Sequence, residues 1–143
     1  MPDILHALPI NAPIGRVFAA VSTPEGLDSW WTQRSAGTPR IGAEYTLWFG
    51  PRYDWRARVT CVETDAAFEL EMVGADEDWI GTRVGIRLRP RDGLTWVEFA
   101  HTRWPSSNEH YRISCTCWAM YLRILRRSLE HGERVPYEAR LDV

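Results

Sequence analysis

Residues 106–132, SSNEHYRISCTCWAMYLRILRRSLEHG, carry the clearest structural signal in this chain. Apolar residues recur there every three or four positions, which predicts one long helix. Ser106 and Glu109 have the spacing of a capping box, and Gly132 suits the position after the last helical turn. Because apolar side chains take up most of the circumference, another layer of the fold must cover this helix.

In the residues before this helix, apolar positions recur with a different period. Polar and apolar residues alternate in five segments, as they do in half-buried antiparallel strands. We predict strands at residues 43–49, 55–62, 68–73, 80–88 and 94–103, with a short strand at 3–9 before them. Residues 35–42 are rich in turn formers and predict a loop. The outward face of this sheet should be solvated, with cross-strand charge pairs among Arg56, Arg58, Glu69, Glu71, Arg83, Arg87 and Glu98.

Two short helices are predicted between the first strand and the others. The first covers residues 13–21, and the second starts with Thr23 as its N-cap and Pro24 at its first helical position. The second helix is expected to carry the neighbours Trp30 and Trp31. Consecutive residues of a helix point about 100° apart. We therefore expect one indole to dock the helix on the sheet rim and the other to face a cavity mouth or water.

Composition narrows the class of protein. A chain of 143 residues with a net charge of −2 is expected to form one domain, residues 1–143, without the basic footprint of a nucleic-acid binder. No apolar run approaches the length of a membrane span. The three cysteines and the lack of a secretory signal favour a reducing, cytoplasmic location. Cys115 and Cys117 would lie about 200° apart on a helix, so we expect no metal site and no cofactor.

Four spaced motifs follow the order of these elements: Ile10-x-Ala12-Pro13, Thr23-Pro24-x-x-Leu27-x-x-Trp30-Trp31, Gly93-x-Thr95-x-Val97-x-Phe99-x-His101 and Trp118-x-x-x-Leu122-x-x-Leu125-x-x-x-Leu129-x-x-Gly132. Over residues 4–136 the chain resembles the START-like (SRPBCC) superfamily, and within it the branch related to the activator of the heat-shock chaperone ATPase. The resemblance implies an α+β helix-grip fold, in which a curved antiparallel sheet wraps around a long C-terminal helix, with two short helices after the first strand. The chain departs from the family pattern at Arg103, where glycine is common, and at Met72, near a common aromatic position.

The resemblance also implies a largely apolar cavity between the sheet and the long helix. Its expected lining is Trp30, Tyr45, Trp55, Met72, Val84, Phe99, His101, Arg103 and Trp118. Aromatic walls with few polar groups are typical of small-molecule sites, although the same residues would also fill a solid core. We expect the chain to bind a hydrophobic small molecule, either a lipid or an aromatic metabolite, and we allow for a weak homodimer.

Two other functions stay open at this point. A cyclase- or hydrolase-like enzyme would use the same pocket, with His101 as its acid or base. His101 could equally be a core histidine satisfied by a neighbour such as Tyr111, and Arg103 could hold a carboxylate or lie exposed in a loop. A co-chaperone-like interaction module would use Trp96 and the basic patch of Arg123, Arg126 and Arg127. Of the three functions, binding without catalysis fits the sequence best.

Overall fold

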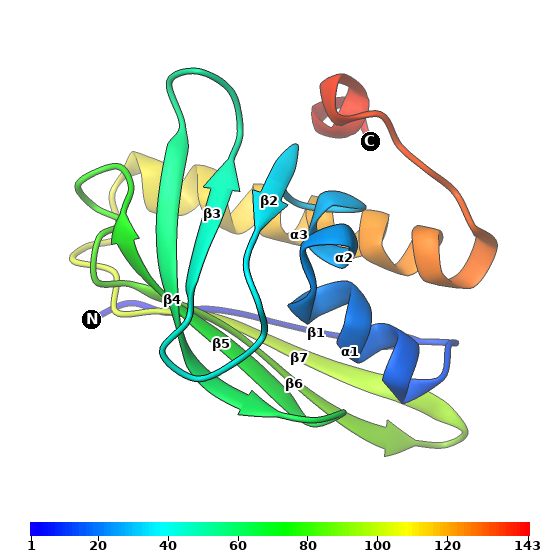
Figure 1. The fold of residues 1–143 in the computed structure, drawn as a ribbon. Helices are drawn as coiled ribbons and strands as arrows, with labels where there is room; N and C mark the ends of the chain where they lie inside the picture. Colours follow the sequence, from blue (N-terminus) through cyan, green and yellow to red (C-terminus); the bar gives the residue numbers. More distant parts are fainter.

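The computed structural model describes residues 1–143 and contains one seven-stranded antiparallel sheet, ordered β1-β7-β6-β5-β4-β3-β2 (Figure 1). The strands are β1 (Ile4–Ile10), β2 (Arg34–Ala36), β3 (Glu44–Trp48), β4 (Asp54–Glu63), β5 (Ala67–Gly74), β6 (Arg83–Arg91) and β7 (Leu94–Thr102). The helices are α1 (Ile14–Ser22), α2 (Pro24–Asp28), α3 (Glu109–His131) and the 3-10 helix η1 (Tyr137–Asp142). The predicted α+β helix-grip class is confirmed.

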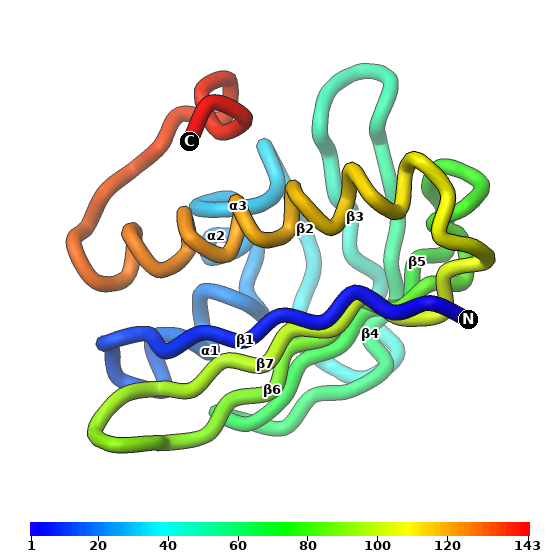
Figure 2. The backbone as a smooth tube through the Cα atoms, turned by 180° about the vertical axis from the view of Figure 1, so that it is seen from behind, coloured from blue at the N-terminus to red at the C-terminus, as the bar shows by residue number.

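The long helix α3 runs across the inner face of the sheet, as the view from behind shows (Figure 2). It begins two residues later than the capping box predicts. Asn108 is the N-cap, and its side-chain oxygen accepts from the Tyr111 backbone N–H at 2.9 Å. Asn108 therefore replaces Ser106 in that role. The predicted C-terminus is confirmed, because Gly132 adopts the left-handed conformation there with φ of 68°.

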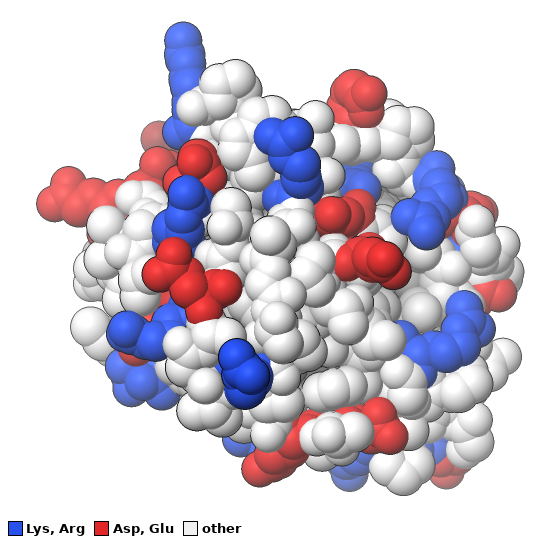
Figure 3. Space-filling model, viewed as in Figure 1, with Lys and Arg blue, Asp and Glu red and all other residues white.

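The sheet curves because its pairing is irregular in β4. Register shifts interrupt the ladder between Arg56 and Ala57 and again between Val59 and Cys61. An extra residue in one strand bends that strand and increases its twist. The outer face carries the expected cross-strand charge pairs, such as Arg58 with Glu71 at 3.2 Å. Figure 3 shows acidic and basic side chains interspersed over one face of the molecule.

Two strand predictions need correction. The loop predicted at 35–42 contains the short edge strand β2, which pairs with β3. The strand predicted from Ile80 begins only at Arg83, because residues 75–82 form a turn in which Gly81 has φ of 85°. Only glycine adopts that backbone readily. Ile80, which was expected to point inward, is therefore 53% exposed.

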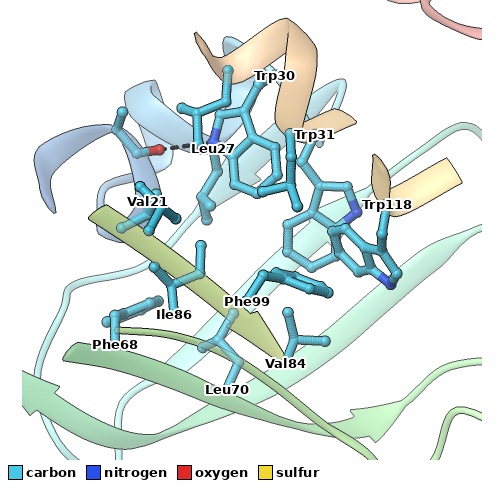
Figure 4. Close-up of a cluster of buried hydrophobic side chains, with 14 of the residues drawn as sticks. Val21, Leu27, Trp30, Trp31, Phe68, Leu70, Val84, Ile86, Phe99 and Trp118 are labelled. Atoms are coloured by element: carbon cyan, nitrogen blue, oxygen red, sulfur yellow. Dashed lines mark hydrogen bonds between the residues drawn. The ribbon is translucent and has the colours of Figure 1, made fainter. Parts of the chain in front are cut away.

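The second short helix is capped as predicted, with the Thr23 side chain accepting from the Gly26 N–H at 3.1 Å. It ends at Asp28, however, so Trp30 and Trp31 lie in the turn that follows and both are buried. Trp30 donates through Nε1 to the carbonyl oxygen of Ala20 at 2.9 Å, as Figure 4 shows. Trp30 thus docks this turn on α1 instead of on the sheet rim.

The space between sheet and α3 is filled by one apolar core. Figure 4 shows Trp30, Trp31 and Trp118 packed over Phe99 and the strand residues below them. The Phe99 and Trp118 ring centroids are 4.5 Å apart. A void of about 10 Å³ lies among Trp30, Val84 and their neighbours, roughly the room that one water needs. No helix of the structure is long and apolar enough to span a membrane.

The C-terminal segment returns over the turn that holds the two tryptophans. Arg140 is only 5% exposed, and its guanidinium donates to the carbonyl oxygens of Asp28 and Thr32 at 2.7 and 3.1 Å. A buried cation without such acceptors would carry a large desolvation cost. These two hydrogen bonds therefore fix η1 next to the end of α2.

Gly26 lies where α2 packs closely against α1, so a substitution at this position tests that contact. A Cβ at this position would collide with the Ala19 carbonyl oxygen and lie 2.5 Å from the Ala20 Cα. We expect Gly26→Ala to lower the free energy of unfolding by about 3 kcal/mol or more, since backbone must move. Urea unfolding would measure the change.

Gly15→Ala is the matched control, because its Cβ would meet only Asp65 Oδ1 at 3.7 Å. This substitution should leave stability unchanged or raise it by up to about 1 kcal/mol through helix propensity. Equal losses in the two variants would contradict the packing argument.

Candidate ligand-binding cleft

An open cleft of about 210 Å³ lies between α3, the β3–β4 hairpin and the C-terminal segment. Eight of its twelve lining residues are Trp, Tyr or Phe, so we call it the aromatic cleft. It is lined by Trp31, Phe49, Tyr53, Trp55, Trp79, His110, Ile113, Ser114, Cys117, Trp118, Tyr121 and Tyr137. Trp31 is thus the member of the tryptophan pair that borders an opening.

One wall of the aromatic cleft is a single face of α3. Its residues there are three or four positions apart, the spacing that brings side chains to one side of a helix. The opposite wall comes from the β3–β4 hairpin, where the Trp55 ring lies 5.3 Å from Phe49 and 6.1 Å from Tyr53. Tyr137 joins the walls at one end by donating its hydroxyl to the Phe49 carbonyl oxygen at 3.2 Å.

Trp79 lies at the centre of this aromatic arrangement. Its ring centroid is 4.8 Å from that of Trp55, and it stacks on His110 and Trp118 at 5.9 and 6.1 Å, each with an interplanar angle of 27°. The residue belongs to the 75–82 turn and is 6% exposed. Its indole Nε1 is buried without a hydrogen-bond acceptor, as is that of Trp104. An unmatched buried donor costs about 1–3 kcal/mol, so packing of the rings must offset this cost.

A hydrogen-bonded chain beneath the cleft fixes His101 as a neutral imidazole. Trp118 Nε1 donates to His101 Nδ1 at 3.0 Å, and His101 Nε2 lies 2.8 Å from Thr82 Oγ1. The Thr82 hydroxyl donates its proton to the Trp79 carbonyl oxygen at 2.6 Å. His101 must therefore carry its proton on Nε2 and donate to Thr82. Burial, helped by the nearby His110, lowers the pKa of His101 from 6.5 to about 3.

His110 stands at the N-terminal end of the cleft wall and pairs with a carboxylate. Its Nδ1 lies 2.9 and 3.0 Å from the two carboxylate oxygens of Asp78, which belongs to the same turn as Trp79. Asn108 Nδ2 also donates to Asp78, at 3.2 Å. The Nε2 atom of His110 has no hydrogen-bond partner in the protein. The cleft thus contains one oriented imidazole with a free nitrogen.

A family model described as Activator of Hsp90 ATPase homolog 1-like protein matches residues 11–130. The match runs from just before α1 through almost all of α3. The chain belongs to this family. The resemblance drawn from the sequence motifs is thereby confirmed. A comparison with curated proteins finds no match.

Solved structures agree with this family membership. The solution structure of the Aha1 dimer from Colwellia psychrerythraea is 27% identical, covers 93% of this chain and 99% of that chain, and has a TM-score of 0.85. A Bacillus halodurans protein is 25% identical, with coverage of 91% and 98% and a TM-score of 0.76. CalU16 from Micromonospora echinospora is 18% identical, with coverage of 98% and 83% and a TM-score of 0.71. At that identity CalU16 shares the fold alone.

The residues predicted to line a cavity fall into three groups. Trp55 and Trp118 line the aromatic cleft. Six others are buried in the core, namely Trp30, Tyr45, Met72, Val84, Phe99 and His101. Arg103 lies outside both, exposed at the end of β7 with φ of 68°. The open space is therefore displaced from the middle of the sheet to one side, because large aromatic side chains fill the middle.

The prediction overlooked three residues that shape the cleft. Asp78 and Trp79 lie in the turn before β6, and His110 is the second residue of α3. The sequence contained one indication of this turn. Gly81 interrupts the alternating apolar pattern of residues 80–88, and an isolated glycine in such a pattern marks a break in the strand. Nothing in the sequence pattern indicates that Asp78 meets His110, since the two residues are 32 positions apart.

Other polar groups along the cleft stay neutral. Burial raises the pKa of the Cys117 thiol, so it is a poor thiolate nucleophile. Burial also raises the pKa of Tyr121 to about 12, so its hydroxyl stays protonated and can donate a hydrogen bond. No group of three or more His, Cys, Asp or Glu side chains is placed to hold a metal ion.

The buried neutral His101 predicts a pH dependence of stability. The unfolded chain takes up a proton at this histidine below about pH 6.5, whereas the folded chain resists protonation down to about pH 3. Stability is therefore lost as the pH falls between these values. At pH 5 the loss relative to pH 7 should be about 2 kcal/mol.

Urea unfolding at pH 7 and pH 5 would measure this loss, with His101→Gln as the test variant. This variant should be less stable at pH 7 but show a smaller change between the two pH values. The exposed His131 gives the control, and His131→Gln should keep the wild-type difference. Identical pH dependence in all three proteins would rule out His101 as the source.

Proposed function

We propose that this protein binds a planar hydrophobic small molecule of one or two fused rings in the aromatic cleft. The observation that carries the proposal is the set of eight Trp, Tyr and Phe side chains that line this one open cleft. Aromatic faces attract other rings through offset stacking and edge-to-face contacts. A concave apolar site with a few polar groups is the usual form of a small-molecule site.

The size of the cleft favours a compact ring system over a lipid. Its volume of about 210 Å³ is below the roughly 300–1,000 Å³ of sites for drug-sized ligands. An acyl chain needs a long apolar tunnel, but the region between sheet and helix is solid core. The polar groups available to orient a small ring compound are His110 at one end and the Tyr121 hydroxyl farther along α3.

A co-chaperone role has less support from the surface. Trp96 on the outer sheet face is covered by the Arg91 guanidinium, 4.4 Å from its ring centre. Within the basic patch, Arg127 is paired with Glu133 at 2.7 Å. Trp96 and Arg127 are thus already engaged within the chain. A homodimer forms part of our proposal because the Colwellia relative was solved as a dimer.

Binding of 2-naphthol, a fused two-ring compound, tests the proposal. We expect its addition to shift the NMR signals of the indole N–H groups of Trp55 and Trp118. Trp55→Leu should weaken binding about two- to tenfold, the worth of one aromatic contact. Tryptophan fluorescence or calorimetry would measure the affinity.

Trp96→Leu is the matched control, because Trp96 is also half-buried but lies away from the cleft. It should leave the affinity unchanged. Equal weakening by both substitutions, or shifts confined to the outer sheet face, would contradict this location. A complete lack of binding by 2-naphthol and related two-ring compounds would overturn the proposed function.

A further inference from the structure

We propose that His110 is a general base that moves a proton on the ligand of the aromatic cleft, and that Asp78 is its positioning residue. The inference rests on the proposed binding function and adds a chemical step to it. The substrate class is a planar one- or two-ring compound with an acidic ring C–H, such as a carbon beside a ring carbonyl.

Asp78 fixes the orientation of the His110 imidazole. Asp78 receives the hydrogen bond from His110 Nδ1 at 2.9 Å, so the proton of a neutral His110 belongs on Nδ1. The lone pair is then on Nε2, which has no hydrogen-bond partner in the protein. A carboxylate that holds one ring nitrogen in this way sets both the tautomer and the direction of the other nitrogen.

The pair formed by His110 and Asp78 lies at the aromatic cleft. His110 lines the aromatic cleft and stacks on Trp79, which in turn contacts Trp55 and Trp118. A ring held against these indoles would lie beside the imidazole. The side chains of His110 and Asp78 are 34% and 18% exposed, so solvent reaches the histidine while the carboxylate is largely covered.

A purely structural role explains less of this arrangement. The Asn108 side chain already ties the 75–82 turn to the start of α3 by its hydrogen bond to Asp78. Asn108 also caps the helix. A second hydrogen bond between the turn and α3 does not require a histidine, and it does not require that residue to line the cleft. His101 offers no alternative base, because both of its nitrogens are engaged inside the protein.

The chemical step is balanced without a further reactant. Nε2 of His110 takes the proton from the carbon beside the ring carbonyl. The C–H electron pair becomes the new carbon–carbon double bond, and the carbonyl π pair moves to the oxygen. The imidazolium then returns its proton to that oxygen, and the product is the enol isomer. Nothing is oxidised or reduced.

The base can be tested with 5-nitrobenzisoxazole, a flat two-ring compound with one acidic C–H. When a base removes this proton, the C–H electron pair completes a nitrile and the ring N–O bond breaks with its electrons going to oxygen, so the ring opens to one coloured cyanophenolate. General bases contribute about 100- to 10,000-fold to such steps. We expect His110→Gln to lower kcat by at least about tenfold, a larger change than any it causes in the affinity for the compound, because His110 also lines the cleft.

Asp78→Asn separates positioning from folding. The asparagine amide can donate to Nδ1 and so move the imidazole proton to Nε2, which removes the base without removing the ring. We expect kcat to fall while KM stays the same. The ¹⁵N NMR shifts should show the Nδ1–H tautomer of His110 in the wild type and the Nε2–H tautomer in Asp78→Asn. His131→Gln is the control and should match the wild type in all readouts.

Binding and turnover are measured separately, so the two proposals can fail separately. Binding of 5-nitrobenzisoxazole without His110-dependent turnover would overturn the general base and leave the binding function in place. Turnover that survives in His110→Gln would also overturn it. Absence of both binding and turnover would count against the cleft itself. A wild-type His110 found as the Nε2–H tautomer would refute the role of Asp78.

Discussion

The hydrogen bonds that run from Trp118 through His101 and Thr82 to Trp79 join three parts of the fold whose relative positions determine the cleft. The direction of each hydrogen bond in this series is determined by the hydrogen bond that follows it. Because the Thr82 hydroxyl gives its proton to the Trp79 carbonyl oxygen, it can only accept from His101. The imidazole must then accept from the Trp118 indole. Helix α3, strand β7 and the 75–82 turn are thereby held in one arrangement.

This constraint explains why the aromatic cleft is formed before any ligand arrives. Trp118 and Trp79 lie at the two ends of the hydrogen-bonded chain, and their rings stack 6.1 Å apart. Indoles held in place lose little conformational freedom when a ligand binds. The arrangement leaves Trp79 Nε1 buried without an acceptor. Packing against Trp55 and His110 offsets that cost, so the stability of the turn depends on the same rings that form the cleft wall.

The repeating elements of this fold were predictable from sequence, and the turn that completes the cleft was not. The period of the long helix and the alternation in β4, β5 and β7 follow from burial of one face. The same alternation continues through Ile80 and Thr82 into β6, although Gly81 turns the chain between them. The strand predicted at 80–88 therefore included the end of this turn, and Asp78 and Trp79 fell in the unassigned stretch before it. Periodicity reports which face is buried, but it does not report where a strand stops.

The two histidines show why residue type and direction do not determine chemical role. Strand alternation correctly places His101 on the inner face, yet Thr82 and Trp118 use both of its nitrogens, and burial keeps it neutral. His110 lies nine residues later on α3 and lines the cleft. A carboxylate holds one of its nitrogens, and the other has no hydrogen-bond partner in the protein. The partners of His101 come from the 75–82 turn and from α3, and the partner of His110 comes from the same turn, distant in sequence. A free imidazole nitrogen is thus a property of the assembled fold, and only the contacts made by that turn distinguish a structural histidine from one able to move a proton.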